Sequence, residues 1–381
     1  PGVLWAKLQE SGTSSVSSEM IGEAARLAGL DLTDAEQDAM VEGVNKNLSR
    51  YRQLRETSID NSVALPLYFN PMVPGMVFDR TPRPFRASKP PTVRRPANLE
   101  DLAFWPVTHI AELVRTRQVS AVDLTEMYLA RLKRYNPLLN CVVTLTEDLA
   151  MRQASQADSE TAAGHYRGPL HGIPWGVKDI VAAKGYPTTW GAAPFQDRVI
   201  DQDATVVERL SEAGAVLVAK LTTGELAFGD RWFGGRTNNP WNPEEGSSGS
   251  SAGSGAATAA GLVGFAIGTD TGGSILAPSV RCGVVGLRPT FGRVSRYGVM
   301  AAGFSLDRIG PMCRTVEDCA VVLDAIAGSD GKDLAVMDDA PFNWDAGLDV
   351  KKLRVGYTKS VFEAEDDEEL KNNNEACLLY T

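Results

Sequence analysis

The stretch GSSGSSAGSG, residues 246–255, has the composition of a flexible linker, but its surroundings predict an ordered loop. It runs directly into AATAAGLVGFAIG, residues 256–268, which carries no charge and has no polar face, so a buried element is predicted. Buried backbone must find hydrogen-bond partners, so a serine-rich loop joined to such a segment is expected to be held in place. The loop therefore belongs to a folded interior, and its serines become candidates for chemistry.

The bulk composition is that of an ordinary globular protein. With 381 residues, of which 43% are hydrophobic and 23% charged, the chain has room for one large domain and a small one. The net charge of −10 predicts an acidic surface, which gives no indication of nucleic-acid binding. The five cysteines are scattered and form no Cys-x-x-Cys pair, which favours buried thiols in a reducing compartment over disulfides or a zinc site.

The sequence predicts no transmembrane helix. The uncharged run over residues 246–269 is long enough to cross a bilayer, but its first third is serine and glycine. The chain starts with PGVLWAKLQE, which has neither an initiator methionine nor the basic-then-apolar pattern of a signal peptide. We expect a cytoplasmic protein without membrane contact. Because the N-terminus reads as incomplete, a removed signal peptide stays an open alternative.

Residues 1–80 predict an N-terminal helical segment, folded as a hairpin of two helices within residues 18–60. The sequence TDAE, Thr33 to Glu36, has the form of a capping box, and the apolar residues after it recur at spacings of three and four. Residues 81–100 are expected to be a Pro-rich basic linker. Five prolines and five basic residues in this segment favour an extended, solvated tether.

From residue 101 helices and strands alternate, which predicts an α/β domain over residues 101–381. Ser120 is placed to cap a helix over residues 121–135. The sequence DATVVERLSEAG predicts a helix that ends at Gly214, before the strand AVLVAKL. We expect a mixed, twisted central sheet flanked by helices.

Three common uses of a glycine-rich loop fit residues 246–255 poorly. A phosphate-binding loop needs a lysine, which is missing here, and a dinucleotide fingerprint needs a third glycine where Thr258 stands. The match of GSSAG to the nucleophile elbow G-x-S-x-G would make Ser251 a nucleophile, but that arrangement needs a later histidine. All three histidines precede Ser251: His109, His165 and His171.

A fourth use is nucleophilic catalysis at a second serine. In GTDTGGSILAP, residues 268–278, Ser274 stands behind two glycines, which let backbone N–H groups approach a substrate carbonyl and form an oxyanion hole. A neutral lysine can replace histidine as the base. The candidate is Lys178 in HGIPWGVKDI, and Asp179 and Asp270 are candidates for orienting the backbone or Lys178. We expect His171 to be structural.

Two of these segments together resemble the amidase signature family. GSSAGSGAATAAGLVGFAIGTDTGGSI, residues 249–275, is similar to the segment that defines the family, and GIPWGVKD, residues 172–179, is similar to its catalytic-lysine motif. The resemblance extends over residues 104–357. It implies the fold of that family and hydrolysis of a carboxylic amide through an acyl-enzyme, without a metal or any other cofactor.

The resemblance also implies a catalytic set, carried over position by position. Ser274 corresponds to the nucleophile and Lys178 to the base, while Ser250 corresponds to a bridging serine that the family holds after a cis peptide bond. The oxyanion hole corresponds to four backbone N–H groups: those of Thr271, Gly272, Gly273 and Ser274.

This assignment places a physical demand on Lys178. A free lysine, with a pKa of about 10.4, must lose about three pKa units to be half neutral at pH 7, which costs roughly 4 kcal/mol. Burial away from water can supply such a shift. Ser250 would then relay a proton from Ser274 to Lys178 and return it to the leaving amine.

The sequence departs from the family pattern in places. Leu276 stands where many members carry an arginine, and whether Arg281 compensates is left open. Residues 291–328 are similar to stand-alone amidases and also to the A subunit of tRNA-dependent amidotransferases, and residues 20–60 weakly resemble the small C subunit of those complexes. The family core continues past the end of this chain, so we expect residues 101–381 to be an amidase domain that is incomplete at its C-terminal end.

We therefore predict an amidase that acts on a small-molecule, non-peptide amide. Two alternatives stay open: the A-type glutaminase subunit of an amidotransferase that acts on Glu-tRNA(Gln) or Asp-tRNA(Asn), and an inactive binding or scaffold protein that keeps the fold. Nucleic acid is an expected partner only for the amidotransferase subunit, and a homodimer is left open.

Overall fold

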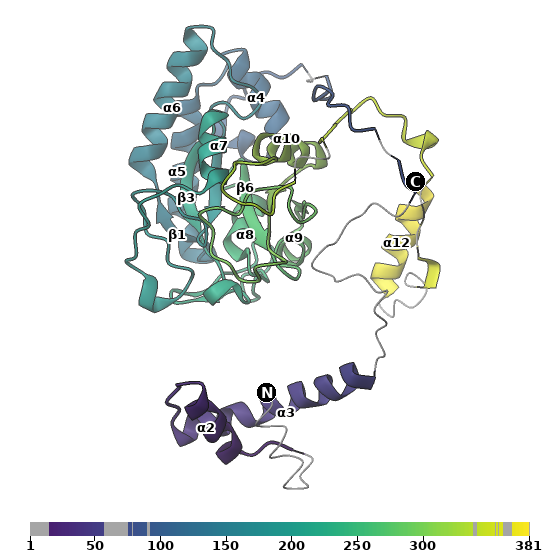
Figure 1. Ribbon diagram of the computed structural model, residues 1–381. Helices are drawn as coiled ribbons and strands as arrows, with labels where there is room; N and C mark the ends of the chain where they lie inside the picture. The colour runs from purple at the N-terminus through teal and green to yellow at the C-terminus, as the bar shows by residue number, and fades with distance from the viewer. Residues whose placement is uncertain are drawn as a thin grey trace. The chain divides into compact units, whose positions relative to one another are not determined.

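The computed structural model describes residues 15–56, 75–77, 79–89, 92–337, 341–354, 356, 358–360 and 368–380. Contacts within the chain divide it into two units, Pro1–Pro71 and Met72–Thr381 (Figure 1). None of the helices in the described ranges combines the length and the hydropathy that a bilayer crossing requires.

The smaller unit contains the predicted helical hairpin. Its helices are α2 (Ser18–Leu27) and α3 (Asp34–Glu56). The capping box that precedes α3 is confirmed, because the Thr33 N–H donates to Glu36 Oε2 at 2.8 Å and the Glu36 N–H donates to Thr33 Oγ1 at 3.4 Å. Ile21 of α2 is buried in a small apolar cluster to which α3 contributes the regularly spaced Val41, Val44 and Leu48.

The larger unit is built on a six-stranded sheet (Figure 1). Its strands are β1 (Val142–Leu145), β2 (Pro174–Lys178), β3 (Val216–Leu221), β6 (Phe265–Asp270), β7 (Val285–Gly286) and β8 (Arg308–Cys313). They lie in the order β1-β3-β2-β6-β8-β7, with β2 parallel to both neighbours and the other pairs antiparallel. The predicted mixed sheet is confirmed. A separate hairpin pairs β4 (Arg231–Trp232) with β5 (Gly235–Arg236).

Helices flank this sheet on both faces. They are α4 (Val107–Arg115), α5 (Ala121–Leu139), α6 (Glu147–Ala162), α7 (Thr205–Glu212), α8 (Ala252–Ala259), α9 (Leu276–Cys282) and α10 (Val316–Ile326). The larger unit also contains α12 (Glu368–Tyr380) and the 3-10 turns η2 (Leu99–Phe104), η3 (Ala193–Phe195), η4 (Glu225–Ala227) and η5 (Val350–Lys352). Successive strand residues point to opposite faces, so the core forms two clusters. Leu217 and Ile267 pack with α4, α7 and α10, whereas Val218 and Ala266 pack with α6 and α8.

Local signals predicted the helix starts better than the helix ends. Ser120 Oγ accepts from the Asp123 N–H at 2.9 Å, as expected for an N-cap. The helix that follows continues past Pro137, beyond the expected end at residue 135, and stops where Asn140 adopts a left-handed conformation. The helix predicted to end at Gly214 ends at Glu212, followed by β3 as expected.

The segment predicted as a linker is exposed, but its backbone is attached to the larger unit. The Arg86 N–H donates to the Trp344 carbonyl at 3.0 Å, and Arg86 in turn accepts from the Ala346 N–H. The Ser88 N–H donates to Glu317 Oε1 at 2.6 Å. Residues 81–89 are therefore held by hydrogen bonds to other segments of the larger unit. Pro90 and Pro91 lie outside the described residues, and the proposed boundaries of linker and domain stay a prediction.

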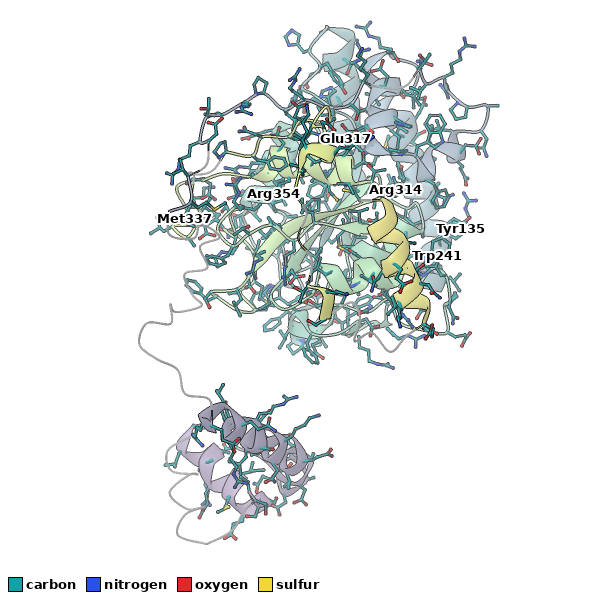
Figure 2. The ribbon with its side chains drawn as sticks, turned by 90° about the vertical axis from the view of Figure 1, so that its right-hand side faces the viewer. Tyr135, Trp241, Arg314, Glu317, Met337 and Arg354 are labelled. Carbon is teal, nitrogen blue, oxygen red and sulfur yellow. The ribbon has the colours of Figure 1, made fainter. Side chains whose placement is uncertain are left out.

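Helix α8 has no polar face, and two arginines from other elements bind the carbonyl groups at its C-terminal end. Arg131 donates to the carbonyls of Ala260 and Gly261 at 3.0 and 2.8 Å. Arg314, labelled in Figure 2, donates to the carbonyl groups of Trp105, Thr258, Val263 and Gly264. Carbonyl groups at a buried helix end would otherwise lack partners, so these arginines allow α8 to lie inside the protein.

Replacement of Arg314 tests this role. We expect Arg314→Met to lower the free energy of unfolding by about 3 kcal/mol, because it leaves several buried carbonyl groups without a donor. Urea unfolding would measure the change. The control Arg115→Met removes an exposed arginine whose ion pair is with Glu112 of the same helix, so a loss of less than about 1 kcal/mol is expected. Equal losses in the two variants would contradict the role of Arg314.

Candidate active site

The residues singled out in the sequence lie at one edge of the sheet. Lys178 is the last residue of β2, and Asp270 is the last residue of β6. These strands are parallel neighbours, so their carboxyl ends meet at the same edge, the usual place for a site in such sheets. The loop that carries Ser250 precedes α8, and Ser274 lies in the turn between β6 and α9.

Lys178 is fully buried and makes its contacts with hydroxyl groups. Its Nζ donates to Ser250 Oγ at 2.7 Å and to Thr269 Oγ1 at 2.9 Å. Burial lowers the pKa of Lys178 to about 7, against the opposing effect of the negative charges of Asp270 and Asp307. A substantial fraction of this amine is therefore neutral at neutral pH, which is the state that a base requires.

The backbone around Ser250 is closely packed. The Gly249–Ser250 peptide bond is cis, and the Gly224 N–H donates to the Ser250 carbonyl at 3.2 Å. A Cβ atom at Gly249 would lie 1.8 Å from the Gly229 carbonyl oxygen, so only glycine fits there. The serine hydroxyl is held against Lys178 by backbone contacts on both sides.

The turn that carries Ser274 is organised by Asp270. Its carboxylate accepts from the N–H groups of Gly273 and Ile275, both at 2.7 Å. Burial alone would raise the pKa of the Asp270 carboxyl, but hydrogen bonds from Ile275, Gly273 and Leu276 and the nearby Arg288 hold it below its ordinary value. Gly273 has a φ of +115°, which L side chains rarely adopt. The turn therefore requires both this carboxylate and this glycine.

Ser274 itself is half-buried at the end of this turn. Its carbonyl accepts from the Ser251 N–H at 3.1 Å, which joins the turn to the Ser250 loop. Its hydroxyl makes no hydrogen bond with any residue that the structure describes. The structure thus joins Lys178 and Ser250 directly, whereas Ser274 is linked to them only through the backbone of the adjacent residue.

One of the four predicted oxyanion donors is already engaged. The Gly273 N–H donates to Asp270 Oδ1. Among the described backbone hydrogen bonds none starts from the N–H groups of Thr271, Gly272 or Ser274. These three donors are therefore the ones available to a substrate oxygen.

Other residues considered in the sequence have structural partners. Ser251 is fully buried, and its hydroxyl donates to the Thr269 carbonyl at 3.0 Å, which is unsuited to the exposed nucleophile of an elbow. His171 is buried, and its Nε2 lies 2.9 Å from the Ala157 carbonyl, as expected for a structural residue. Four cysteines are buried free thiols: Cys141, Cys282, Cys313 and Cys319.

A second buried lysine was missed in the sequence. Lys220 of β3 lies 2.7 Å from Asp179 Oδ1, and both side chains are fully buried. Asp179 also accepts from the Thr189 N–H at 2.9 Å. Burial lowers the pKa of Lys220, while Asp179 opposes this effect. Asp179 therefore orients Lys220 and the loop at Thr189 rather than the Lys178 amine. The signal for this pair was a lysine inside the otherwise apolar strand AVLVAKL.

Arg281 does not replace the missing arginine at Leu276. Arg281 is half exposed and pairs with Glu245 at the surface. The cation beside the Ser274 turn is instead Arg288, whose Nη1 lies 3.4 Å from Asp270 Oδ1.

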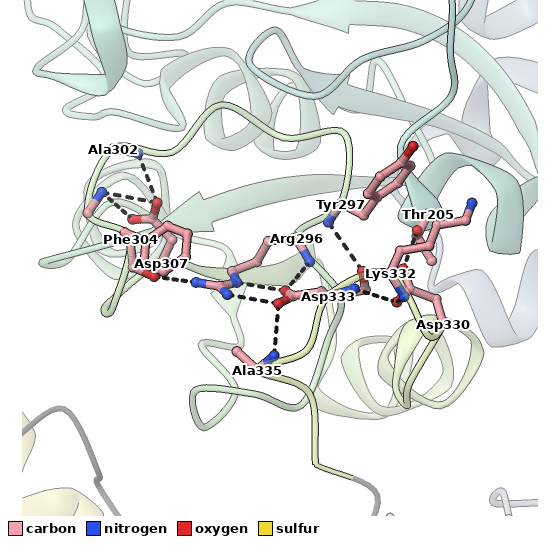
Figure 3. Close-up of polar contacts among 12 residues, drawn as sticks. Thr205, Arg296, Tyr297, Ala302, Phe304, Asp307, Asp330, Lys332, Asp333 and Ala335 are labelled. Atoms are coloured by element: carbon pink, nitrogen blue, oxygen red, sulfur yellow. Dashed lines mark hydrogen bonds and ion pairs between the residues drawn. The ribbon is translucent and has the colours of Figure 1, made fainter.

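A cavity of about 550 Å³ adjoins the site. Its lining includes Thr269, which contacts Lys178, and Asp307, which accepts from the N–H groups of Ala302 and Gly303 (Figure 3). Apolar side chains supply much of the wall: Ile180, Val299, Met300, Phe304, Ile309 and Leu334. Size and lining suit a small organic substrate. In the described part of the chain, no three His, Cys, Asp or Glu side chains are grouped in a way that suits a metal ion.

Comparison with known proteins gives a family and its relatives. The family model described as Amidase matches residues 123–378. The A-type subunit of the glutamyl-tRNA(Gln) amidotransferase of Methylococcus capsulatus is 44% identical over 261 residues, which are 67% of this chain and 54% of that protein. The corresponding protein of a Roseiflexus species is 43% identical over 258 residues, 66% and 53% of the two chains. This chain spans about half the length of the curated relatives it matches.

Solved structures agree with the fold. The peptide amidase of Stenotrophomonas maltophilia is 40% identical, with a TM-score of 0.59 over 62% of this chain and 50% of that chain. The A-type subunit of the glutamyl-tRNA(Gln) amidotransferase of Thermotoga maritima is 33% identical, with a TM-score of 0.53 over 62% and 50% of the two chains. The likeness to stand-alone amidases and to A-type amidotransferase subunits, stated from the sequence, is therefore confirmed.

The burial of Lys178 predicts a specific dependence of stability on pH. Below about pH 7 the folded and unfolded states both carry the proton, whereas between about 7 and 10.5 only the unfolded state does. The free energy of unfolding should therefore rise with pH in that interval, by up to about 1.4 kcal/mol per pH unit from this group. Lys178→Met should remove that contribution, as measured by urea unfolding at pH values of about 7.5, 8.5 and 9.5, which lie between the folded and unfolded pKa values.

Lys133→Met serves as the matched control, because Lys133 is exposed and pairs with Glu147. Its stability should follow that of the unmodified chain across the same pH values. If Lys178→Met also kept the original slope, the amine at position 178 would not be the buried, depressed group described above.

Proposed function

This chain belongs to the amidase family, and from that premise we propose that it hydrolyses the C–N bond of a small carboxylic amide through an acyl-enzyme on Ser274. The observation that supports this most is the 2.7 Å hydrogen bond between the buried Lys178 amine and the Ser250 hydroxyl. A lysine with a pKa of about 7 can take up and return a proton at neutral pH. A serine hydroxyl next to it can pass that proton on, since it is both donor and acceptor.

In the proposed first step, Ser274 Oγ attacks the amide carbonyl carbon. Its proton moves to Ser250 Oγ, and the proton of Ser250 moves to the neutral Lys178 amine. Negative charge develops on the carbonyl oxygen, where the N–H groups of Thr271, Gly272 and Ser274 would stabilise it. These N–H groups have no other partner in the described structure.

The intermediate then collapses, and the C–N bond breaks. Lys178 returns its proton through Ser250 to the leaving nitrogen, so ammonia or an amine departs neutral and Ser274 is left as an ester. Water attacks this ester with the same relay acting as base, and the carboxylic acid is released. Each proton taken up by Lys178 is given back in the same half-reaction.

A second candidate is the glutaminase function of an A-type amidotransferase subunit. It is favoured by the 44% identity to such a protein of Methylococcus capsulatus. That function would use the same relay on the side-chain amide of glutamine, with partner subunits and charged tRNA as the further requirements. The third alternative is an inactive scaffold. It stays open because the chain matches only about half of the length of its relatives.

Ammonia release separates these functions. We expect the chain alone to release ammonia from butyramide, and Ser274→Ala to lower kcat by about four orders of magnitude or more, because the nucleophile is lost. Ser159→Ala is the control, since Ser159 is an exposed residue of α6 whose hydroxyl bonds within that helix. Turnover of glutamine only with partner subunits and tRNA would establish the subunit function. A chain that neither releases ammonia nor reacts with a serine-directed phosphonate would be a scaffold.

The pH profile tests the base. Because Lys178 is active only when neutral, kcat/KM should rise tenfold per pH unit below about pH 7 and level off above it. Lys178→Ala should lower the rate of acylation by several orders of magnitude while the far-UV circular dichroism stays unchanged. Near-normal turnover by this variant, or a profile that falls as the pH rises through 7, would refute the assignment of Lys178.

A further inference from the structure

Three cationic side chains line the cavity beside the site: Arg296, Arg308 and Lys332. Two of them have carboxylate partners. Arg296 donates to both oxygens of Asp333 at 2.8 and 2.9 Å (Figure 3), and Lys332 Nζ lies 3.1 Å from Glu208 Oε2. Arg308 forms no ion pair with any described residue, and its recorded hydrogen bond is the one from Nη1 to the Leu306 carbonyl. One cation of the cavity wall is thus left without a counter-ion.

The carboxylates closest to Arg308 in the fold are already occupied. Asp270 binds the backbone of the Ser274 turn and lies 3.4 Å from Arg288. Asp307 accepts from the N–H groups of Ala302 and Gly303 and from the Thr271 hydroxyl. Burial and the positive charge of Arg288 both lower the pKa of Arg308, although Asp270 and Asp307 oppose this. A further negative charge beside the Arg308 guanidinium would therefore stabilise its charged form.

The position of Arg308 connects the cavity to the reacting atoms. It lies opposite Asp270 in the antiparallel pair of β6 and β8, so these two side chains share one face of the sheet. Thr269, which contacts Lys178, lines the same cavity as Arg308. A group bound by Arg308 would therefore lie in the cavity that extends to Thr269, next to Lys178.

We propose that Arg308 binds a carboxylate group carried by the amide substrate. A guanidinium offers five N–H donors in a planar fork that matches the two oxygens of a carboxylate, and four of those of Arg308 have no recorded partner. The apolar side chains that line the cavity would hold the short chain between carboxylate and amide. This inference rests on the proposed function and specifies its substrate class: a short dicarboxylic acid monoamide.

The test uses succinamate and butyramide, which have the same chain length. Succinamate ends in a carboxylate where butyramide ends in a methyl group. Binding is measured by isothermal titration calorimetry on the full chain with Ser274→Ala, so that no turnover occurs. We expect succinamate to bind about ten- to a hundredfold more tightly than butyramide, and Arg308→Gln to remove that difference. Arg308→Lys, which keeps the charge but loses the fork, should retain part of it.

The matched control is Arg281→Gln, a surface arginine that pairs with Glu245 outside the cavity; it should leave both affinities unchanged. Thermal unfolding shows whether the Arg308 variants are folded. If Arg308→Gln is not folded, the binding difference is measured with Arg308→Lys instead. Equal binding of the two compounds by the parent chain, or a preference for succinamate that survives the loss of Arg308, would overturn the proposal.

Turnover tests the proposed function separately. In the chain with Ser274 intact, Arg308→Gln should raise KM for succinamate by about the same ten- to a hundredfold, whereas the control Arg281→Gln should leave it within about twofold. A chain that binds succinamate through Arg308 but hydrolyses neither amide would contradict the proposed function and support the binding site. Hydrolysis of both amides at equal kcat/KM would support the proposed function and contradict the carboxylate site at Arg308.

Discussion

A lysine amine held out of water sets the conditions for the rest of the site. Its two hydroxyl partners come from segments far apart in the chain, Ser250 before α8 and Thr269 in β6. Both can reach Lys178 because β2 and β6 are adjacent parallel strands. The pKa of about 7 reflects a balance, since burial favours the neutral amine and the charges of Asp270 and Asp307 favour the ammonium. A direct carboxylate contact would keep the lysine charged.

Lys220 is a second fully buried lysine, but its closest partner is a carboxylate rather than a hydroxyl group. It is as deeply buried as Lys178 and lies one position away in the register of β2 and β3. The difference is Asp179, which lies 2.7 Å from the Lys220 amine. Burial lowers the pKa of Lys220, the Asp179 carboxylate opposes that effect, and the contact joins β3 to the residue that follows β2. Neighbouring strands thus carry one lysine suited to proton transfer and one suited to structure.

Much of the architecture could be predicted from the sequence because its signals are local. The Thr33 capping box, the Ser120 cap and the strand after Gly214 each depend on a few adjacent residues. The burial of most of residues 256–268 could be predicted because the segment carries no charge and has no polar face. The roles of Lys178 and Ser250 came from resemblance, and their contact distance could come only from the fold.

The features that sequence reasoning missed all depend on tertiary contacts. The engagement of the Gly273 N–H by Asp270 follows from a turn conformation that the motif GTDTGGS does not reveal. The partner of Asp179 comes from a strand 41 positions later in the chain. The surface location of Arg281 depends on how α9 ends against the loop at Glu245.

The glycine contact at Gly249 has a consequence for how such a protein can change over time. The loop of Ser250 meets Gly229 backbone to backbone, with no side chain between them that could be exchanged. Most of the cavity wall, by contrast, comes from residues 296–309 and 332–335, and of the residues that contact Lys178 it includes Thr269. Substitutions in the cavity wall can therefore accumulate without disturbing the close backbone contact at Gly249.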